Sequence, residues 1–457
     1  MPSSNRMSAQ ELRVSISLSG IFGLRMLGMF VILPVFAIYA EQLPGGDNLT
    51  LVGVALGAYG LTQAILQIPF GAWSDRYGRK PVIYAGLLIF AAGSFVAAAA
   101  PNIYVVILGR VLQGAGAISA AVMAMVADLT REEHRTKAMA MIGSTIGATF
   151  ALSLVVSPWL NKVIGVPGIF ALTGVLAFAA MAVVYSVVPD TKAEPRAGAR
   201  RGLAGFQDVL RDTQLARLYY GVFALHAVLM ALFIAVPFTL RDAGLALDQH
   251  WKVYLPVMLG SFVLMLPAVL NAGRPAQARM AFIVSVALLL LTQLAMPWLG
   301  GGVWPIALYL LMFFTAFNIL EASLPSLVSR MAPAGVKGTA IGIFSSLQFF
   351  GTFLGAVAGG YLYGRWGAAG VVILDATLLV IWLGIAFGMK VPAALSTRAY
   401  ALPELDRGLT DGLLAELRAV PGVHEALVIA GEHMLHLKVD STGFDEQNVL
   451  KLIARET

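Results

Sequence analysis

Long apolar stretches separated by short polar connections make up most of this chain. Each comes close to or exceeds the roughly 20 residues that an α-helix needs to cross the hydrocarbon core of a bilayer. The pattern therefore predicts an all-α polytopic membrane protein with 12 membrane-spanning helices. We place these helices at about 14–40, 50–73, 81–100, 103–127, 138–160, 168–188, 216–240, 252–272, 280–299, 303–329, 338–362 and 368–390.

Polar segments divide the chain into four predicted parts. Six spans fall within residues 1–189 and six within 216–391, on either side of a basic linker at 190–215 that includes an amphipathic piece. After Pro392 the composition becomes mixed, and the pattern of residues 397–457 predicts the order strand, helix, strand, strand, helix. We therefore expect two six-helix halves, a cytoplasmic linker and a small α+β domain.

The two halves carry a weak internal repeat. The segment Arg135–Ala140 after the fourth span is echoed by Lys337–Gly342 after the tenth, about 200 residues later. Related halves of six helices are typical of transporters whose substrate site lies between the halves. Chance similarity between two short basic connections is the alternative explanation of this echo.

Composition narrows the class of protein. Only 12% of the residues are charged, whereas soluble domains carry roughly 25%, so lipid is the main solvent of the chain. The absence of cysteine excludes disulfides, thiolate metal sites and cysteine nucleophiles. The sequence also lacks a nucleophile, base and cofactor constellation, and its net charge of +6 resides in short connections. We therefore expect no enzyme activity, no cofactor, no metal site and no nucleic-acid partner.

Basic residues collect on one side of the predicted membrane. They occur in the N-terminal segment, in the linker, and in the connections after the second, fourth, eighth and tenth spans. Because cytoplasmic connections are enriched in Lys and Arg, both termini and the linker are predicted to be cytoplasmic. The expected location is the cytoplasmic (inner) membrane of a bacterium.

A charged stretch bracketed by glycines, residues 71–81, lies between the second and third spans. Together with a second motif in the fourth span, it resembles the signature sequences of the major facilitator superfamily. The matching positions are Gly71, Asp75, Arg76, Gly78, Arg79 and Lys80 in this stretch, and Gly109, Arg110, Gln113 and Gly114 in the fourth span. The resemblance covers about residues 10–390 and implies two six-helix halves that rock about a central site. The glycines at 71 and 78 suit close packing and turn dihedrals.

The charges of this stretch predict a latch on the cytoplasmic side. Asp75 is placed to meet the positive N-terminus of the helix that begins near Gly338 and Thr339 in the opposite half. Arg79 can pair with Asp128 at the cytoplasmic end of the fourth span. The resemblance implies that this latch stabilises the outward-facing state. A solvated loop that only sets the topology is the alternative.

Polar residues inside apolar spans are costly and usually face a cavity or a partner. Arg25 and Arg110 are candidates for a cationic wall of a central cavity. The alternative is internal ion pairing or carbonyl binding that holds helices together. We place Gln113 and Asn318 at the same cavity. Glu321 is our main candidate for a proton carrier, with a structural role as the alternative.

Two further residues are weaker candidates for proton coupling. His226 lies in the seventh span, where a packing role is the alternative. Asp375 lies in the last span, where the alternative is a side chain that reaches the outer lipid headgroups.

Around residues 24–30 and 128–132 the chain looks closest to a bacterial type of this superfamily that is regarded as proton-driven efflux proteins. We therefore expect a secondary transporter that exports a small amphiphilic molecule in exchange for protons. Two departures weaken the antiport assignment: Ser157–Pro158 stands where drug antiporters have Gly-Pro, and Arg25 stands where many have a carboxylate. The alternatives are an organic-anion uptake carrier or facilitator, and a membrane sensor that binds ligand without transporting it.

The C-terminal segment resembles a ferredoxin-like heavy-metal-associated domain that lacks its last strand. The cysteine pair that binds metal in that family is absent, and His424, His433 and His436 fall on different parts of the predicted unit. We expect the domain to have a regulatory role or to mediate self-association.

Overall fold

The computed structural model describes residues 7–189, 209–271, 275–299, 302–332, 337–389, 395–401, 407–429, 434–440 and 444–456. Most of the predicted linker, and His433, therefore lie outside the described residues. The chain divides into two units, one made of residues 1–266 and 282–388 and the other of residues 267–281 and 389–457.

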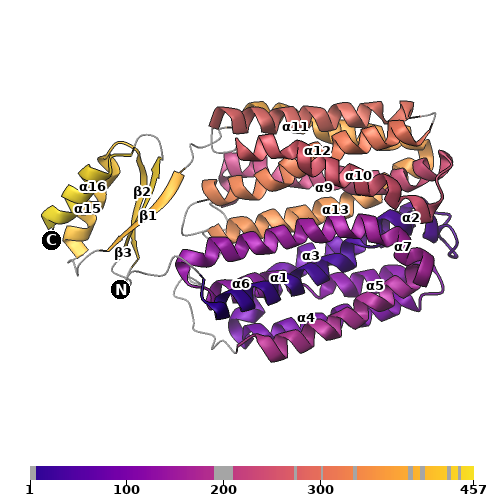
Figure 1. Cartoon of the computed structure of the whole chain (residues 1–457), viewed down its shortest axis with the longest axis horizontal. Coiled ribbons are helices and arrows are strands. Elements are labelled where there is room, and N and C mark those ends of the chain that lie inside the picture. The colour runs from indigo at the N-terminus through magenta and orange to yellow at the C-terminus, as the bar shows by residue number, and fades with distance from the viewer. Residues whose placement is uncertain are drawn as a thin grey trace. The chain divides into compact units, whose positions relative to one another are not determined.

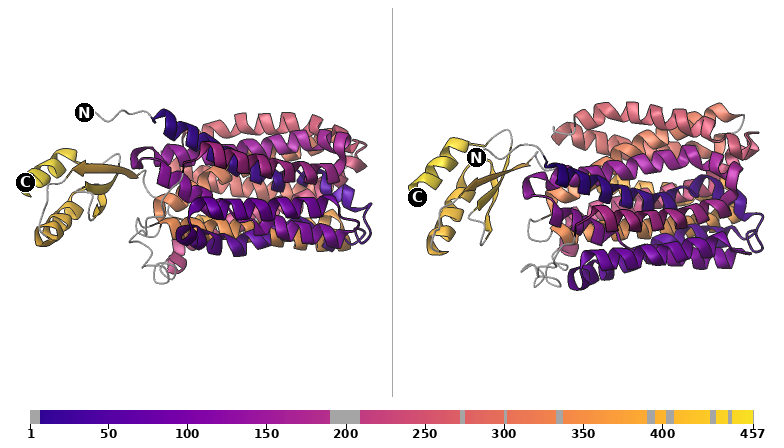
Figure 2. Two further views of the ribbon diagram at one scale, coloured as in Figure 1. Left: turned by 90° about the horizontal axis from the view of Figure 1, so that it is seen from below. Right: turned by 60° about the horizontal axis from the view of Figure 1, so that its bottom comes forward.

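Helices of the first unit run side by side and roughly parallel to one another (Figure 1, Figure 2). In the described part of the chain, 11 helical segments are long and apolar enough to cross a membrane. The helices are α1 (Ala9–Phe30), α2 (Leu33–Ala40), α3 (Leu49–Tyr77), α4 (Arg79–Ala98), α5 (Ile103–Ala115), α6 (Ser119–Leu129), α7 (Glu132–Val187), α9 (Thr213–Asp242), α10 (Trp251–Leu270), α11 (Pro275–Ala295), α12 (Val303–Met331), α13 (Lys337–Trp366) and α14 (Ala368–Phe387). We refer to α1–α7 as the N-terminal half and to α9–α14 as the C-terminal half.

Two predicted spans are broken in the structure. The first is split into α1 and α2 next to Pro34, which lacks the N–H that a continuous helix would use. The fourth is split into α5 and α6 at Gly116, whose φ and ψ of −70° and 51° are not helical. Such breaks release backbone carbonyls, which then need partners inside the protein.

Helix α7 contains the opposite feature, because two predicted spans are joined in it. Its apolar part is 51 residues long, which at 1.5 Å per residue is about 75 Å and far exceeds the roughly 30 Å of hydrocarbon. The non-helical residue inside it is Gly165, with φ of 66° and ψ of 173°. Pro167 follows and lacks a backbone N–H. The helical stretches on the two sides of Gly165 correspond to the predicted spans 138–160 and 168–188.

The charged stretch 71–81 is mostly helical, although we placed it between the second and third spans. Helix α3 continues to Tyr77, and α4 begins at Arg79, so Gly78 alone separates them. Gly78 has a φ of 93°, a region that favours glycine. Gly71 lies inside α3, where a Cβ would come within 3.3 Å of Ala120 in α6. Its small size therefore serves helix packing and not a turn.

Close contact between the halves is made by α3 and α13. A Cβ at Gly57 of α3 would lie 2.9 Å from the carbonyl oxygen of Phe353, and one at Gly60 would lie 2.7 Å from that of Phe349. Gly351, Gly355 and Gly359 of α13 face α9 instead. A Cβ at Gly359, for example, would lie 2.8 Å from the Cα of Ala231. The glycines of α3 thus form part of the approach between the halves. In α13, Gly359 packs within its own half, whereas a Cβ at Gly360 would clash with the carbonyl oxygen of Leu49 in α3.

In the second unit, a three-stranded antiparallel sheet of order β1-β3-β2 packs against two helices (Figure 1). The elements are β1 (Leu395–Ala401), α15 (Arg407–Ala419), β2 (Val423–Ile429), β3 (Met434–Asp440) and α16 (Glu446–Glu456). Alternate residues of β3, from Leu435 to Val439, point to one face and pack with Leu417 and Val449 of the helices. The order of the elements is the one predicted, and the ferredoxin-like assignment stays a prediction.

Candidate functional site

Three polar side chains meet near the middle of the C-terminal half. His226 from α9, Glu321 from α12 and Gln348 from α13 lie within reach of one another. The Nε2 atom of His226 is 2.8 Å from Nε2 of Gln348 and 3.6 Å from Oε2 of Glu321. The side chain of Glu321 is 35% exposed, whereas His226 is buried. We call these three residues the polar cluster.

The hydrogen bonds of the polar cluster depend on which ring nitrogen of His226 carries a hydrogen. The Nδ1 atom of His226 is 3.1 Å from the carbonyl oxygen of Val222, and a carbonyl only accepts, so Nδ1 carries the hydrogen. In the neutral ring Nε2 then accepts a hydrogen bond from the amide of Gln348. A proton added at Nε2 would face that amide donor, and Glu321 is the nearby acceptor. The neutral ring with its hydrogen on Nδ1 is thus the form that fits both contacts of His226.

An aromatic cluster lies next to these polar groups and joins the two halves. Phe150 of α7 is at its centre, and its ring centroid is 5.0–6.4 Å from those of four other phenylalanines. These four are Phe30 from α1, Phe233 from α9, and Phe314 and Phe317 from α12. The ring of Phe317 also meets that of His226, at 6.0 Å. The aromatic cluster thus contacts the polar cluster directly.

Arg25 does not form the wall of an open cavity in the structure. Its side chain is buried in the N-terminal half, where Nε donates to the carbonyl of Gly116 at 2.9 Å and Nη1 to Oγ of Ser119 at 2.8 Å. Nη2 donates to the side-chain oxygen of Gln63. The carbonyl of Gly116 is available because α5 and α6 are broken there. These contacts match the alternative in which arginine binds carbonyls and holds helices together.

Arg110 is buried in the same way. Its Nη1 donates to the carbonyl of Gly28 at 3.2 Å and to Oε1 of Gln113 at 2.7 Å, and Gln113 in turn donates to Ser94 at 2.8 Å. Both arginines lie over the ring of Tyr59, with guanidinium carbons 5.6 Å and 4.9 Å from its centroid. The prediction that Arg110 and Gln113 line an open cavity is therefore not met in this conformation.

Asn318 and Asp375 are also buried and do not line an open cavity. Asn318 donates to Oγ of Ser261 at 3.0 Å and so ties α12 to α10. Asp375 in α14 is fully buried, and its carboxylate oxygens have no hydrogen-bond partner among the described residues. The alternative that Asp375 reaches the outer headgroups is wrong, because its side chain points into the protein.

The predicted pair between Arg79 and Asp128 is present at the cytoplasmic end of the N-terminal half. Nε of Arg79 is 3.0 Å from Oδ2 of Asp128, and its Nη1 is 2.5 Å from Oδ1 of Asp75. The same Nη1 donates to Oγ of Ser74 at 2.7 Å. Arg76 does not join this group, since its guanidinium lies over the neighbouring ring of Tyr77 at 5.5 Å.

Among the described residues, Asp75 does not make its predicted contact with the opposite half. Its side chain is 69% exposed, and the described ion pair of its carboxylate is with Arg79. The predicted partner Gly338 and the nearby Gly342, both in α13, have open space where a Cβ would point. The latch is therefore disengaged in this conformation.

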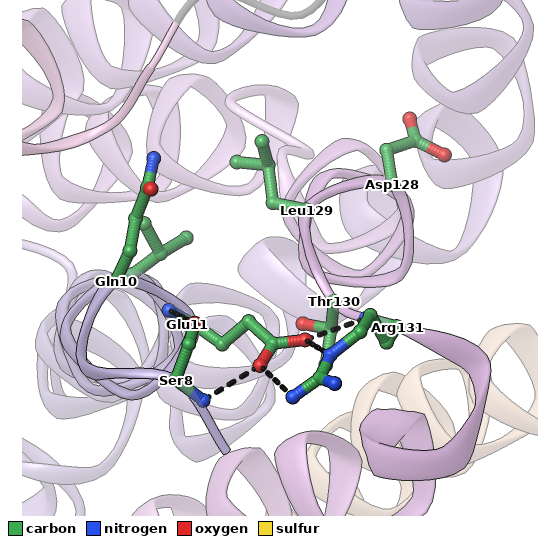
Figure 3. A pocket seen from close by; sticks show the side chains of 8 residues that line it. Ser8, Gln10, Glu11, Asp128, Leu129, Thr130 and Arg131 are labelled. Carbon is green, nitrogen blue, oxygen red and sulfur yellow. Dashed lines mark hydrogen bonds and ion pairs between the residues drawn. The ribbon is translucent and has the colours of Figure 1, made fainter. Parts of the chain in front are cut away.

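Beside the latch, a cavity of about 450 Å³ opens between the start of α1 and the connection from α6 to α7 (Figure 3). Figure 3 shows the carboxylate of Glu11 facing the guanidinium of Arg131. Arg131 donates to Oε1 of Glu11 from its backbone N at 2.9 Å and from Nε at 3.0 Å. The connection between α6 and α7 is thus held on one side by Arg79, through Asp128, and on the other by α1. Sequence reasoning missed this second pair.

On the opposite, outer side, ion pairs connect the two halves. Nζ of Lys162 in α7 is 2.8 Å from Oδ2 of Asp248, in the short helix η2 (Leu247–Gln249). Nη1 of Arg241 in α9 is 2.6 Å from Oε2 of Glu41, just after α2. With the α3–α13 approach near Gly57, these pairs close the outer side. We refer to this arrangement, with contact between the halves on the outer side and the latch disengaged among the described residues, as inward-facing.

Comparison with known proteins decides the family. Residues 18–356 match the model of the Major Facilitator Superfamily. The chain belongs to the major facilitator superfamily. It is therefore a multi-pass membrane transporter of a small-molecule substrate, and not an enzyme.

Relatives and solved structures agree with this assignment. The chain is 40% identical to the inner membrane transport protein YajR of Escherichia coli over 439 residues, which are 95% of this chain and 96% of YajR. It is 28% identical to the multidrug resistance protein MdtH of Cronobacter sakazakii, over 78% of this chain and 90% of that protein. A bacterial homologue of the lysosomal transporter Spinster, solved in an inward-facing occupied conformation, superposes with a TM-score of 0.66 at 12% identity, covering 83% of this chain and 97% of that one. The similarity to YajR confirms the bacterial type indicated by the sequence, and the Spinster homologue shows the shared fold.

Proposed function

We propose that this transporter exports a small amphiphilic molecule in exchange for protons, and that Glu321 carries the proton. The observation that carries the proposal is the setting of Glu321. Its carboxylate is partly exposed at the middle of a span, beside His226 and Gln348. Asp375, by contrast, is fully buried. The exposed part of its carboxylate supports the proposal that Glu321, and not Asp375, is open to the transport path in this conformation.

Alternating exposure would couple this carboxylate to transport. Burial disfavours the charged form of a carboxyl group, whereas contact with water favours it. If the halves rock, the water-exposed side of Glu321 changes, and a proton taken up on one side is released on the other. His226 supports this step because its Nε2 atom, which also contacts Gln348, is 3.6 Å from the carboxylate.

The surroundings of Glu321 suit a substrate that is partly apolar and partly polar. The aromatic cluster supplies apolar surface next to the polar cluster, through the contact of Phe317 with His226. The relative named for multidrug resistance supports export of such a molecule. Burial of Arg25 and Arg110 weakens one of the two observations that favoured an organic-anion carrier, and the other, the departure from the antiporter motif at Ser157–Pro158, remains.

The fuller architecture is part of the proposal. The break at Gly165 in α7 supports twelve spans in two halves of six, because each helical stretch beside it is close to the length of a span. The sheet order β1-β3-β2 with both helices on one face supports a ferredoxin-like domain that regulates the transporter or mediates self-association.

Flux measurements test the proposed coupling. The purified protein is reconstituted into liposomes with a fluorescent amphiphile chosen because it stabilises the protein thermally. We expect an imposed pH gradient to drive wild-type flux and to have no effect on Glu321→Gln. The matched control is Asp375→Asn, which changes a buried carboxyl in the same half. Gradient-driven flux through Glu321→Gln at the wild-type rate would contradict the role of Glu321.

A further inference from the structure

The aromatic cluster joins the two halves at the centre of the protein. Phe150 is an N-terminal-half residue whose ring meets three rings of the C-terminal half, at 5.9–6.4 Å. It is buried, as are its partners. Arg25 and Arg110, by contrast, donate their hydrogen bonds to groups of the N-terminal half.

The order of residues along the helices gives the depth of this cluster. Helix α12 enters from the outer side, so Phe314 and Phe317 precede Glu321 on the way to the cytoplasm. In α7, Phe150 lies 12 residues before Lys162 of the outer ion pair, or about 18 Å along the helix. The cluster therefore lies between the outer ion pairs and the polar cluster.

The chemistry of the contact suits a seal that opens and closes. Aromatic rings exclude water and attract one another without fixed hydrogen bonds. Two surfaces of this kind can separate without leaving unpaired polar groups behind. A proton path from the outer side to Glu321 would have to pass the rings while the halves are in contact.

We propose that Phe150 is the sealing residue of the outer half of the transport path, closing it against Phe233, Phe314 and Phe317 in the inward-facing state. It is a positioning residue, because it acts by keeping water and protons from the polar cluster. The proposal holds whether or not Glu321 carries the transported proton, since any open path through the centre needs a barrier.

Proton leak tests the seal. Liposomes containing the protein and an internal pH-sensitive dye are given a pH gradient, with no substrate present. We expect Phe150→Ala to dissipate the gradient several-fold faster than wild type, and Phe150→Leu to leak less because its side chain fills more of the space. The matched control is Phe178→Ala, which removes a ring of the stacked and partly exposed pair with Phe95.

Separate measurements keep folding and coupling apart from sealing. Thermal unfolding of each variant shows whether it is folded, and if Phe150→Ala does not fold, the partner variant Phe314→Ala replaces it. A leak in the double variant Phe150→Ala with Glu321→Gln would show that the seal is independent of the proposed proton carrier. Leak rates of Phe150→Ala and Phe150→Leu equal to that of Phe178→Ala would overturn the proposal, whatever the result of the coupling experiment.

Discussion

The outer and cytoplasmic ends of the membrane unit use the same types of residue in different ways. At the outer end, ion pairs join the two halves, as between Lys162 and Asp248. At the cytoplasmic end, the described pairs of Asp75, Arg79 and Asp128 stay within the N-terminal half. The difference shows that the position of a charged residue in the sequence does not determine whether its ion pair joins the two halves. That depends on which residue it pairs with in the folded protein.

The strengths of these contacts fit a protein that switches state. Exposed ion pairs contribute about 0.2–1 kcal/mol each, which is at most about fivefold in an equilibrium. The outer pairs are partly exposed on both partners. A steric clash at the α3–α13 approach is harder to relieve than the loss of an ion pair, because the contacts there are with backbone atoms. We therefore expect variants at the glycine contacts to change the balance between the two conformations most, variants of the latch next and variants of the outer ion pairs least.

Gly57→Leu in α3 should have the largest effect. A Cβ at this position would lie 2.9 Å from the carbonyl oxygen and 3.0 Å from the Cα of Phe353, and backbone cannot move aside as a side chain can. Overpacking costs about 1–3 kcal/mol, so the outer closure should weaken by about fivefold or more. Spin-label distances across the outer side, measured on pairs of introduced cysteines, report the change. The matched control is Gly342→Leu, where the described structure leaves open space. Equal effects of both variants would contradict the comparison.

Arg79→Ala should act at the cytoplasmic end alone. It removes the partner of Asp75 and Asp128, and a hydrogen bond to a charged group is worth about 1.5–3 kcal/mol. Because these pairs do not join the halves here, the inward-facing population should stay the same or rise, and transport should fall. Distances between labels on the cytoplasmic ends measure this population. Arg76→Ala is the control, since its guanidinium lies over Tyr77 instead. A lower inward-facing population in Arg79→Ala would show that the pairs already hold this state together.

Charge reversal of an outer pair should have the smallest effect. Lys162→Asp places two carboxylates opposite each other and should lower the inward-facing population by up to about fivefold at low salt. Adding Asp248→Lys restores an ion pair of opposite polarity and should restore the population. The same outer distances measure both variants, and high salt should reduce the effect. A double variant that behaves like the single one would mean that the pair does not act on the closure.

Several features of the fold could be predicted from sequence because they depend on local properties. The length of an apolar stretch determines whether it can span a membrane, and basic residues indicate its orientation. The pair of Arg79 and Asp128 was also predictable, because both lie next to span ends on the same side. The helical continuation of α3 to Tyr77 was not, since glycine and charge patterns describe loops and helix ends equally well.

The candidate site was less predictable. Gln348 was missed although it is a polar residue in an apolar span, and the same signal led to Arg25 and Arg110, which are buried elsewhere. Phe150 carried no signal, because a phenylalanine in a membrane span is ordinary. Pairs between distant parts of the chain, such as Glu11 with Arg131, leave no spacing pattern to read.

By itself the sequence determined the spans, their orientation, the motif of the family and the order of elements in the C-terminal unit. These follow from hydrophobic length, charge and periodicity, which act within a few residues. Only the tertiary structure decided that Arg25 binds the carbonyl of Gly116, that Glu321 meets His226, and that Phe150 reaches the other half. The physical reason is that a helix has several faces, all of them largely apolar here. Packing against other helices decides which face meets lipid, a partner or water.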